Sequence, residues 1–259
     1  EASVQIFSDI DPNEMLRIID KGLSQDQSLG LALTYGKDAV TQSRGLSGGM
    51  HYLDSLKTLV DSEDQLRAIE QMVVELYYDS LKVSEGLAAL KKFKRSFEQK
   101  EELSYWYKNM RFELEDLAPG AAVPDFEFVS TEGDTVNQES IKGNLTLLEF
   151  TLMENGLYQD QYDQLTVSYQ LFADSGLSIY TMAFDESSTT ILAFFEERDR
   201  FWSLAEPPSM DRKRLLEDFN IQFYPTRVLI DQEGNIIRKF IGEELDDVIP
   251  YITSHLATD

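Results

Sequence analysis

The feature that most restricts the fold is the tripeptide Ala118-Pro119-Gly120, where the spacing of apolar residues changes. Proline and glycine end a helix and begin an extended segment. Before this point apolar residues recur at helical spacing, and after it short apolar runs alternate with amphipathic stretches. We therefore predict a two-domain α+β chain, with an all-helical module over residues 1–117 and an α/β domain over residues 118–259.

The helical module contains recognisable start and stop signals. Asp11-Pro12 predicts a helix that begins at the proline, and Ser62 predicts the cap of a helix whose apolar face extends to Tyr77. The glycine-rich stretch 44–49 predicts a break between two helices. Two further amphipathic segments complete the module: 84–97 and 101–114. No fixed-period repeat is found.

Strand and helix patterns alternate in the second domain. The turns at 131–134 and 231–235 predict two hairpins, because each contains glycine and acidic residues between apolar runs. Buried strands are expected at 145–150 and 177–184. The expected helices span residues 159–174, 187–198, 211–219 and 243–256. This order predicts a sheet covered by helices.

The chain contains no cysteine and only two histidines, His51 and His255. Disulfides, thiolate nucleophiles, iron–sulfur clusters and cysteine-containing zinc sites are therefore excluded, as is a site built from several histidines. The sequence also lacks a P-loop, a dinucleotide-binding glycine motif and a Ser–His–Asp order. We expect no cofactor and no metal.

The net charge of −24 restricts the possible partners. Residues 1–117 carry −7 and residues 118–259 carry −17. Phosphate binding needs clustered Lys and Arg, so we expect neither nucleic acid nor an anionic lipid surface as a partner. The longest basic run, residues 91–95, is interpreted as a solvated helix face, with docking of an acidic partner as the alternative. No stretch is long and apolar enough for a transmembrane helix.

Six motifs between residues 118 and 256 occur in the order and spacing of one family. They are Pro119-Gly120 with Val123-Pro124-Asp125-Phe126, Glu132-Gly133-Asp134, Ile141-Lys142-Gly143, Leu147-Leu148-Glu149-Phe150, Tyr224-Pro225-Thr226, and Val228-Leu229-Ile230-Asp231 with Glu233-Gly234. The domain resembles the TlpA/ResA-like, peroxiredoxin-related branch of the thioredoxin superfamily. The resemblance implies a thioredoxin-like fold with a cis peptide bond before Pro225.

The redox motif of that family is missing. Counted from Phe150 without a gap, its Trp-Cys-x-x-Cys positions fall on residues 154–158, so Asn155 stands at the nucleophilic cysteine and Tyr158 at the resolving one. Neither an amide nor a phenol can attack a disulfide. We therefore expect a redox-inactive domain without enzymatic activity, in which Asn155 caps the following helix.

In the resembled family, the cis proline beside the two cysteines presents its backbone to an extended substrate. We interpret Pro225 first as a structural turn, and a groove for an extended peptide or small ligand as the alternative. The candidate groove residues are Glu154, Asn155, Tyr158, Tyr224, Pro225 and Thr226. A third hypothesis transfers catalysis to carboxylates such as Glu149 and Glu154.

The preferred hypothesis is a non-catalytic accessory subunit that binds protein partners in a cell-envelope assembly. The resemblance implies a periplasmic or outer-membrane-associated protein of Bacteroidetes type. The chain begins with Glu1 rather than Met, which fits removal of a targeting segment, and a lipid anchor ahead of Glu1 is left open. Two Asp-Ser-Leu tripeptides, centred on Ser55 and Ser80, resemble an O-glycosylation acceptor of Bacteroidetes.

Overall fold

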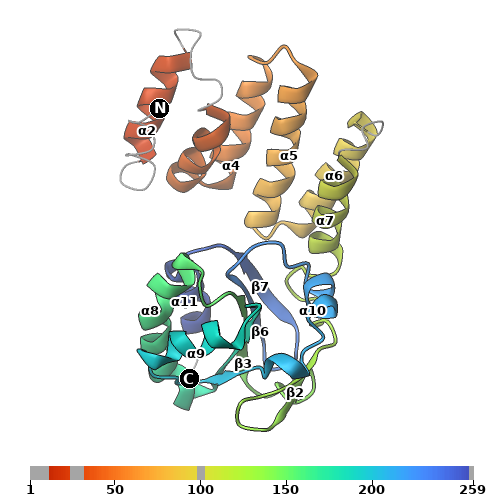
Figure 1. Cartoon of the computed structure of the whole chain (residues 1–259). Coiled ribbons are helices and arrows are strands. Elements are labelled where there is room, and N and C mark those ends of the chain that lie inside the picture. Colours follow the sequence, from red (N-terminus) through yellow and green to blue (C-terminus); the bar gives the residue numbers. More distant parts are fainter. Residues whose placement is uncertain (1–11, 24–31, 98–102, 257–259) are drawn as a thin grey trace. The chain divides into compact units, whose positions relative to one another are not determined.

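The computed structural model describes residues 12–23, 32–97 and 103–256 (Figure 1). The chain divides into two compact units, residues 1–114 and 115–259, and each is described by itself. Among the described residues, no helix is both long and apolar enough to cross a membrane.

The described part of the first unit is helical. Its elements are α2 (Pro12–Leu23), the π-helical segment η1 (Ala32–Gly36), α4 (Lys37–Lys57), α5 (Glu63–Asp79), α6 (Val83–Phe97) and α7 (Leu103–Glu115). The predicted start at Pro12 is confirmed, while Asp11 lies outside the described residues. The predicted cap is confirmed as well, because the Ser62 hydroxyl accepts a hydrogen bond from the Gln65 amide at 3.1 Å.

The predicted break within residues 44–49 is confirmed at Gly45, where two helical segments of α4 meet at a kink. Only Gly45 leaves the helical conformation, with a φ of 69°, and this produces a kink. Gly49 is helical and buried, and a Cβ atom there would lie 2.9 Å from Leu76 Cδ2 of α5. The glycine therefore allows α4 and α5 to approach closely, which the sequence pattern alone does not distinguish from a loop.

Two clusters of buried apolar residues hold the helices of the first unit together. The larger joins α2, η1, α4 and α5 through residues such as Ile19, Leu53 and Ile69. The smaller centres on Val74, Leu90 and Leu114 and joins α5, α6 and α7. The helical stripes seen in the sequence thus face one another across neighbouring helices.

The second unit contains a two-stranded and a five-stranded sheet. The strands are β1 (Glu127–Val129), β2 (Thr135–Asn137), β3 (Leu145–Thr151), β4 (Leu177–Ala183), β5 (Ser203–Leu204), β6 (Thr226–Ile230) and β7 (Ile236–Ile241). The helices are α8 (Gly156–Phe172), η2 (Ala173–Ser175), α9 (Ser188–Glu196), η3 (Pro207–Ser209), α10 (Arg212–Asp218) and α11 (Leu245–Leu256). Both predicted hairpins are confirmed as the antiparallel pairs β1–β2 and β6–β7.

The larger sheet has the strand order β5-β4-β3-β6-β7. The central strand β3 is fully buried, parallel to β4 and antiparallel to β6. An apolar cluster packs α8, α9 and α11 against one face of the sheet. On the other face, the Phe150 ring of β3 contacts Phe219, which follows α10, at a centroid distance of 4.9 Å. This is the predicted α/β thioredoxin-like fold, with the site of interest where β3 meets α8.

Candidate functional site

Asn155 stands at the junction of β3 and α8 and makes two hydrogen bonds with one side chain. It is the N-cap of α8, with Oδ1 accepting from the Tyr158 amide at 3.0 Å. Its Nδ2 donates to the carbonyl oxygen of Tyr224 at 3.0 Å. The predicted capping role is confirmed. The amide therefore satisfies a free N–H of the helix and ties the start of α8 to the turn before β6.

The Tyr224–Pro225 bond is cis, as the resemblance implied. Pro225 and Thr226 are buried, and the Thr226 hydroxyl donates to the Phe223 carbonyl at 2.8 Å. Tyr224 is half-buried and stacks on Phe184 with ring centroids 5.9 Å apart. In contrast, the Phe223 side chain is 64% exposed. Of the residues in this turn, Phe223 presents the most apolar surface.

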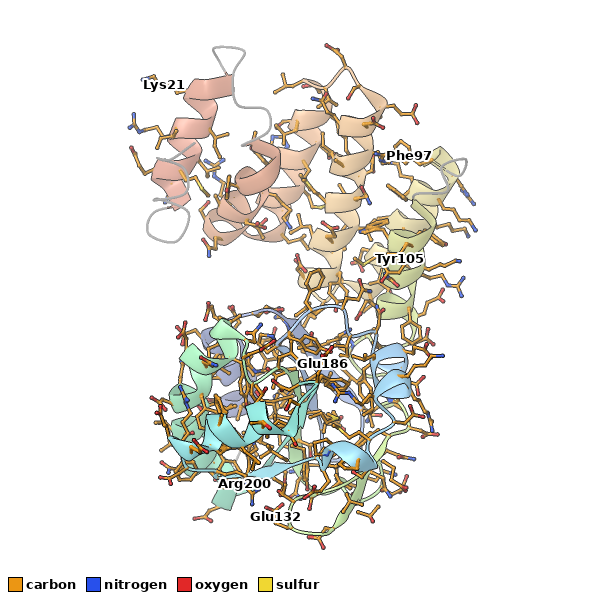
Figure 2. All side chains as sticks on the ribbon, in the orientation of Figure 1. Lys21, Phe97, Tyr105, Glu132, Glu186 and Arg200 are labelled. Carbon is orange, nitrogen blue, oxygen red and sulfur yellow. The ribbon has the colours of Figure 1, made fainter. Side chains whose placement is uncertain are left out.

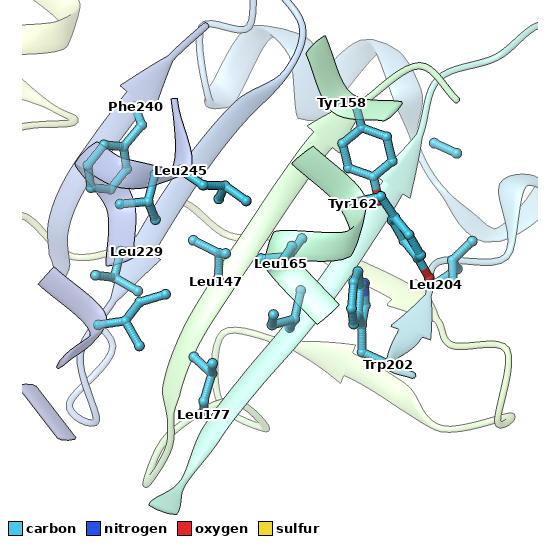
Figure 3. Packing of buried hydrophobic residues seen from close by; sticks show 14 of the residues in the cluster. Leu147, Tyr158, Tyr162, Leu165, Leu177, Trp202, Leu204, Leu229, Phe240 and Leu245 are labelled. Carbon is cyan, nitrogen blue, oxygen red and sulfur yellow. The ribbon is translucent and has the colours of Figure 1, made fainter. Parts of the chain in front are cut away.

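Tyr158 lies in the core rather than in a groove. Its side chain is 1% exposed and packs among Tyr162 and Phe194, with centroid distances of 6.1 and 5.9 Å (Figure 3). Burial raises the pKa of the Tyr158 phenol well above its ordinary value, and the nearby Glu149 carboxylate adds to that rise. Because its side chain is buried, Tyr158 presents no surface to a ligand in this structure.

A buried ion pair lies behind Tyr158. Glu149 in β3 and Arg227 in β6 are 0% and 1% exposed, and Arg227 Nε lies 2.9 Å from Glu149 Oε1. The other carboxylate oxygen accepts from the Thr181 hydroxyl of β4 at 2.8 Å. Trp202 Nε1 donates to the same hydroxyl at 2.8 Å. The network therefore links three adjacent strands in the middle of the sheet.

The network leaves two polar groups without a hydrogen-bond partner among the described residues. They are the Tyr158 hydroxyl and Arg227 Nη2. Arg227 Nη1 donates to the Glu243 carbonyl at 3.3 Å. Such groups carry a desolvation cost, so the surrounding packing must hold the network in place.

The hypothesis of carboxylate chemistry at Glu149 and Glu154 gains no support from the structure. Glu149 is buried and committed to Arg227, whereas Glu154 is exposed at the start of α8. General acid–base catalysis by a pair of carboxylates needs both to reach one substrate, and these two occupy different environments. In the described residues, no group of three or more acidic or histidine side chains is placed to hold a metal ion.

A second set of contacts fixes the end of β3. The buried Asp185 carboxylate accepts from the Met153 amide at 2.9 Å, and Arg212 donates to the carbonyl oxygens of Phe184 and Asp185. The Arg212 guanidinium also lies over the Phe184 ring, 5.1 Å from its centroid. The segment that leads into residues 154–158 is therefore held from the sheet and from α10.

The second unit has cavities away from Asn155. A cavity of about 620 Å³ lies between α9 and the segment after β5, where its lining includes Leu192, Phe195, Arg198, Leu204 and Pro207. Two smaller hollows are lined near Trp202 and near His255. None of these three cavities includes Asn155, Tyr224 or Pro225.

The chain is similar in sequence to several known proteins. The chain is 22% identical over 139 residues to the thiol-disulfide oxidoreductase ResA of Bacillus cereus, which is 53% of this chain and 78% of the relative. A ResA of Bacillus anthracis is 21% identical over the same shares. The second unit is a thioredoxin-like domain. It is similar to thiol-disulfide oxidoreductases but holds no cysteine. No family model matches the chain.

Solved structures match a similar share of the chain. A thioredoxin domain of a thiol-disulfide oxidoreductase from Bacteroides vulgatus is 25% identical, with a TM-score of 0.48, and the match covers 54% of this chain and 99% of that chain. A thiol:disulfide interchange protein from Bacteroides sp. is 23% identical, with a TM-score of 0.47, and the match covers 54% and 91%.

The ion pair of Glu149 with Arg227 was not predicted from the sequence. The signal was present, because each charged residue interrupts an otherwise apolar strand. A charge in a fully buried strand needs a partner, and an acid and a base at such positions predict each other. The bond from Asn155 to the Tyr224 carbonyl carried no comparable signal, because any polar side chain could cap α8.

Proposed function

We propose that the protein is a non-catalytic accessory subunit that acts by binding another protein in a cell-envelope assembly. The observation that carries this proposal is the use of Asn155, whose amide both caps α8 and holds the Tyr224 carbonyl. The position of the catalytic thiol in related oxidoreductases serves here to join two elements. With no thiol in the chain, what remains for function is the surface of the two units.

The alternative is a peptide- or small-ligand-binding module that uses the former active-site region beside Pro225. The exposed Phe223 side chain favours it. Three observations weigh against it: the Tyr224 carbonyl already accepts a hydrogen bond, Tyr158 is buried, and Thr226 is buried. An extended peptide pairs with free backbone groups, and the group beside the proline is engaged here.

The proposed location, periplasmic or outer-membrane-associated with a possible lipid anchor, rests on the resemblance to TlpA/ResA-like proteins. A chain without cysteine needs no reducing partner, which fits a role other than thiol exchange. A Bacteroidetes type of organism is proposed on the same resemblance.

Two measurements test the proposal. Purified protein should show no insulin-disulfide reduction, because no thiolate can form. Protein isolated under native conditions from the organism that makes it should elute with a mass above the 29.7 kDa of the chain. A lone chain with a ligand bound beside Pro225 would favour the alternative.

A further inference from the structure

Exposed cations without an ion-pair partner gather on one helical hairpin. In this acidic chain, exposed cations elsewhere commonly meet an acid: Lys142, Arg200, Lys213 and Arg214 pair with Glu139, Glu132, Glu217 and Asp218. Within the described residues, no ion pair involves Lys91, Lys94 or Arg95 of α6, or Lys108 of α7. We call these four residues the basic face.

The spacing of these residues places the α6 members on one side of that helix. Positions 91, 94 and 95 lie within one turn of each other, and all three side chains are exposed. Lys94 Nζ lies 5.3 Å from the centroid of the Tyr107 ring of α7, so the cations border the second helix. Lys92 points the other way and pairs with Glu70 of α5 at 3.1 Å.

The acids nearest to the hairpin on α5 are already engaged. Glu70 is shared by Lys57 and Lys92, at 3.2 and 3.1 Å. Glu75 accepts a hydrogen bond from Trp106 Nε1 at 3.1 Å. These two α5 carboxylates are therefore engaged within the unit and do not neutralise the basic face.

An exposed aromatic side chain, Tyr105, lies one turn before Lys108 on α7. Tyr105 on α7 is 68% exposed (Figure 2). Beneath it, Trp106 packs on Phe93 with ring centroids 4.8 Å apart, which ties α7 to α6. Tyrosine and arginine are enriched at protein interfaces, and an anchored aromatic next to a cation fits a contact surface better than a fully solvated face.

We propose that the basic face and Tyr105 bind an acidic segment of a partner protein that also presents apolar side chains. This inference rests on the proposed function and names the chemistry of the partner. Charge complementarity carries it, because the basic face groups four exposed cations that have no ion-pair partner among the described residues, in a chain of net charge −24. A long nucleic acid would meet the acidic remainder of the protein, whereas a short acidic segment contacts the basic face alone.

The probe is a fluorescein-labelled peptide of repeated Glu-Asp-Leu-Phe units, measured by fluorescence anisotropy with the full chain. A variant carrying K91Q, K94Q, R95Q and K108Q should bind it at least about tenfold more weakly, with a shallower salt dependence. The matched control carries K142Q, R200Q, K213Q and R214Q. It removes the same amount of charge from ion-paired surface positions and should bind within about twofold of the unmodified chain.

Other results would overturn the inference. Equal losses in the two variants would mean that only overall charge matters. Tighter binding of duplex DNA or of phosphatidylglycerol vesicles than of the peptide would assign the basic face to those partners. If the unmodified chain does not bind the peptide, and the basic-face variant expands in small-angle scattering, the acidic unit of the same chain occupies the surface. Each of these outcomes would leave a native complex intact and thus separates this inference from the proposed function.

Discussion

Asn155 Nδ2 donates a hydrogen bond to the Tyr224 carbonyl oxygen, and this bond joins the start of α8 to the turn before β6 across 69 positions of sequence. The same amide caps α8 through its oxygen. Two elements that lie far apart in the sequence are thereby held together by one side chain. The junction stabilises the domain and has no reactive group.

Replacing Asn155 separates the two bonds. Asn155→Ala removes both and should lower the free energy of unfolding of the second unit by about 2 kcal/mol, the sum of a cap and one further hydrogen bond. Asn155→Asp keeps the capping oxygen and loses only the donor, so a loss of about 1 kcal/mol is expected. Urea denaturation monitored by the fluorescence of Trp202, in a shared Trp106→Phe background, measures both. Equal losses would show that the cap contributes nothing, and an Asn155→Asp variant as stable as the unmodified protein would show that the bond to Tyr224 contributes nothing.

The buried pair of Glu149 and Arg227 should show strong coupling. Glu149→Leu or Arg227→Met alone leaves a buried charge without its partner, which costs about 3–5 kcal/mol. The double variant removes both charges, and we expect it to be more stable than either single variant. A double-mutant cycle in urea measures the coupling. Additive losses would indicate that the two groups do not interact in solution.

The buried Tyr158 phenol should make the free energy of unfolding depend on pH in the alkaline range. Its pKa is raised in the folded protein, so the unfolded chain loses the proton first. The contribution to stability is complete below about pH 10, the ordinary tyrosine pKa, and declines as pH rises above it. Tyr158→Phe should reduce this decline and leave stability at about pH 7 unchanged or higher, because it removes a buried hydroxyl without a hydrogen-bond partner.

The measurement is the urea midpoint at about pH 7, about pH 9 and about pH 11 for both proteins. Burial also raises the pKa values of Tyr162, Tyr180 and Tyr224, so the variant should keep a smaller slope. Parallel profiles for the two proteins would contradict the assignment to Tyr158.

Two glycines in helices should respond in opposite directions to alanine. At Gly49 a Cβ atom would press on Leu76, so Gly49→Ala should destabilise the first unit by about 1–3 kcal/mol. At Gly156, in the first turn of α8, no atom lies within 4 Å of the added Cβ. Gly156→Ala should therefore stabilise the second unit by up to about 1 kcal/mol. Thermal unfolding of both variants measures the contrast, and a destabilised Gly156→Ala would contradict it.

Much of the fold could be predicted from local patterns. The hairpins, the buried strand β3 and the start of α2 follow from residues close together in sequence. The helical course through residues 47–49 could not, because a glycine that permits close packing has the same local signature as one that ends a helix. β5 was missed because two residues carry no periodicity.

The position of the candidate site in the chain could be predicted from the sequence, but the burial and contacts of its side chains could not. Spacing from Phe150 placed Asn155 at the start of α8, and the Tyr224-Pro225-Thr226 motif of the resembled family implied the cis bond before Pro225. The burial of Tyr158 depends on how α8 rotates against the sheet, which single-residue spacing does not determine. The groove role of Asn155, Tyr224 and Pro225 stays a prediction.

The most direct test of the account compares two exposed aromatic residues in the native protein. Tyr105 and Phe223 are 68% and 64% exposed, and Phe223 directly precedes Tyr224 and Pro225. Each is replaced by alanine in the organism that makes the protein, and the mass under native conditions is measured by size-exclusion chromatography with light scattering. We predict a complex heavier than the mass of the same chain under denaturing conditions for the unmodified protein and for Phe223→Ala, and its loss or weakening for Tyr105→Ala. A complex that survives Tyr105→Ala and disappears in Phe223→Ala would contradict the account and assign function to the region beside Pro225.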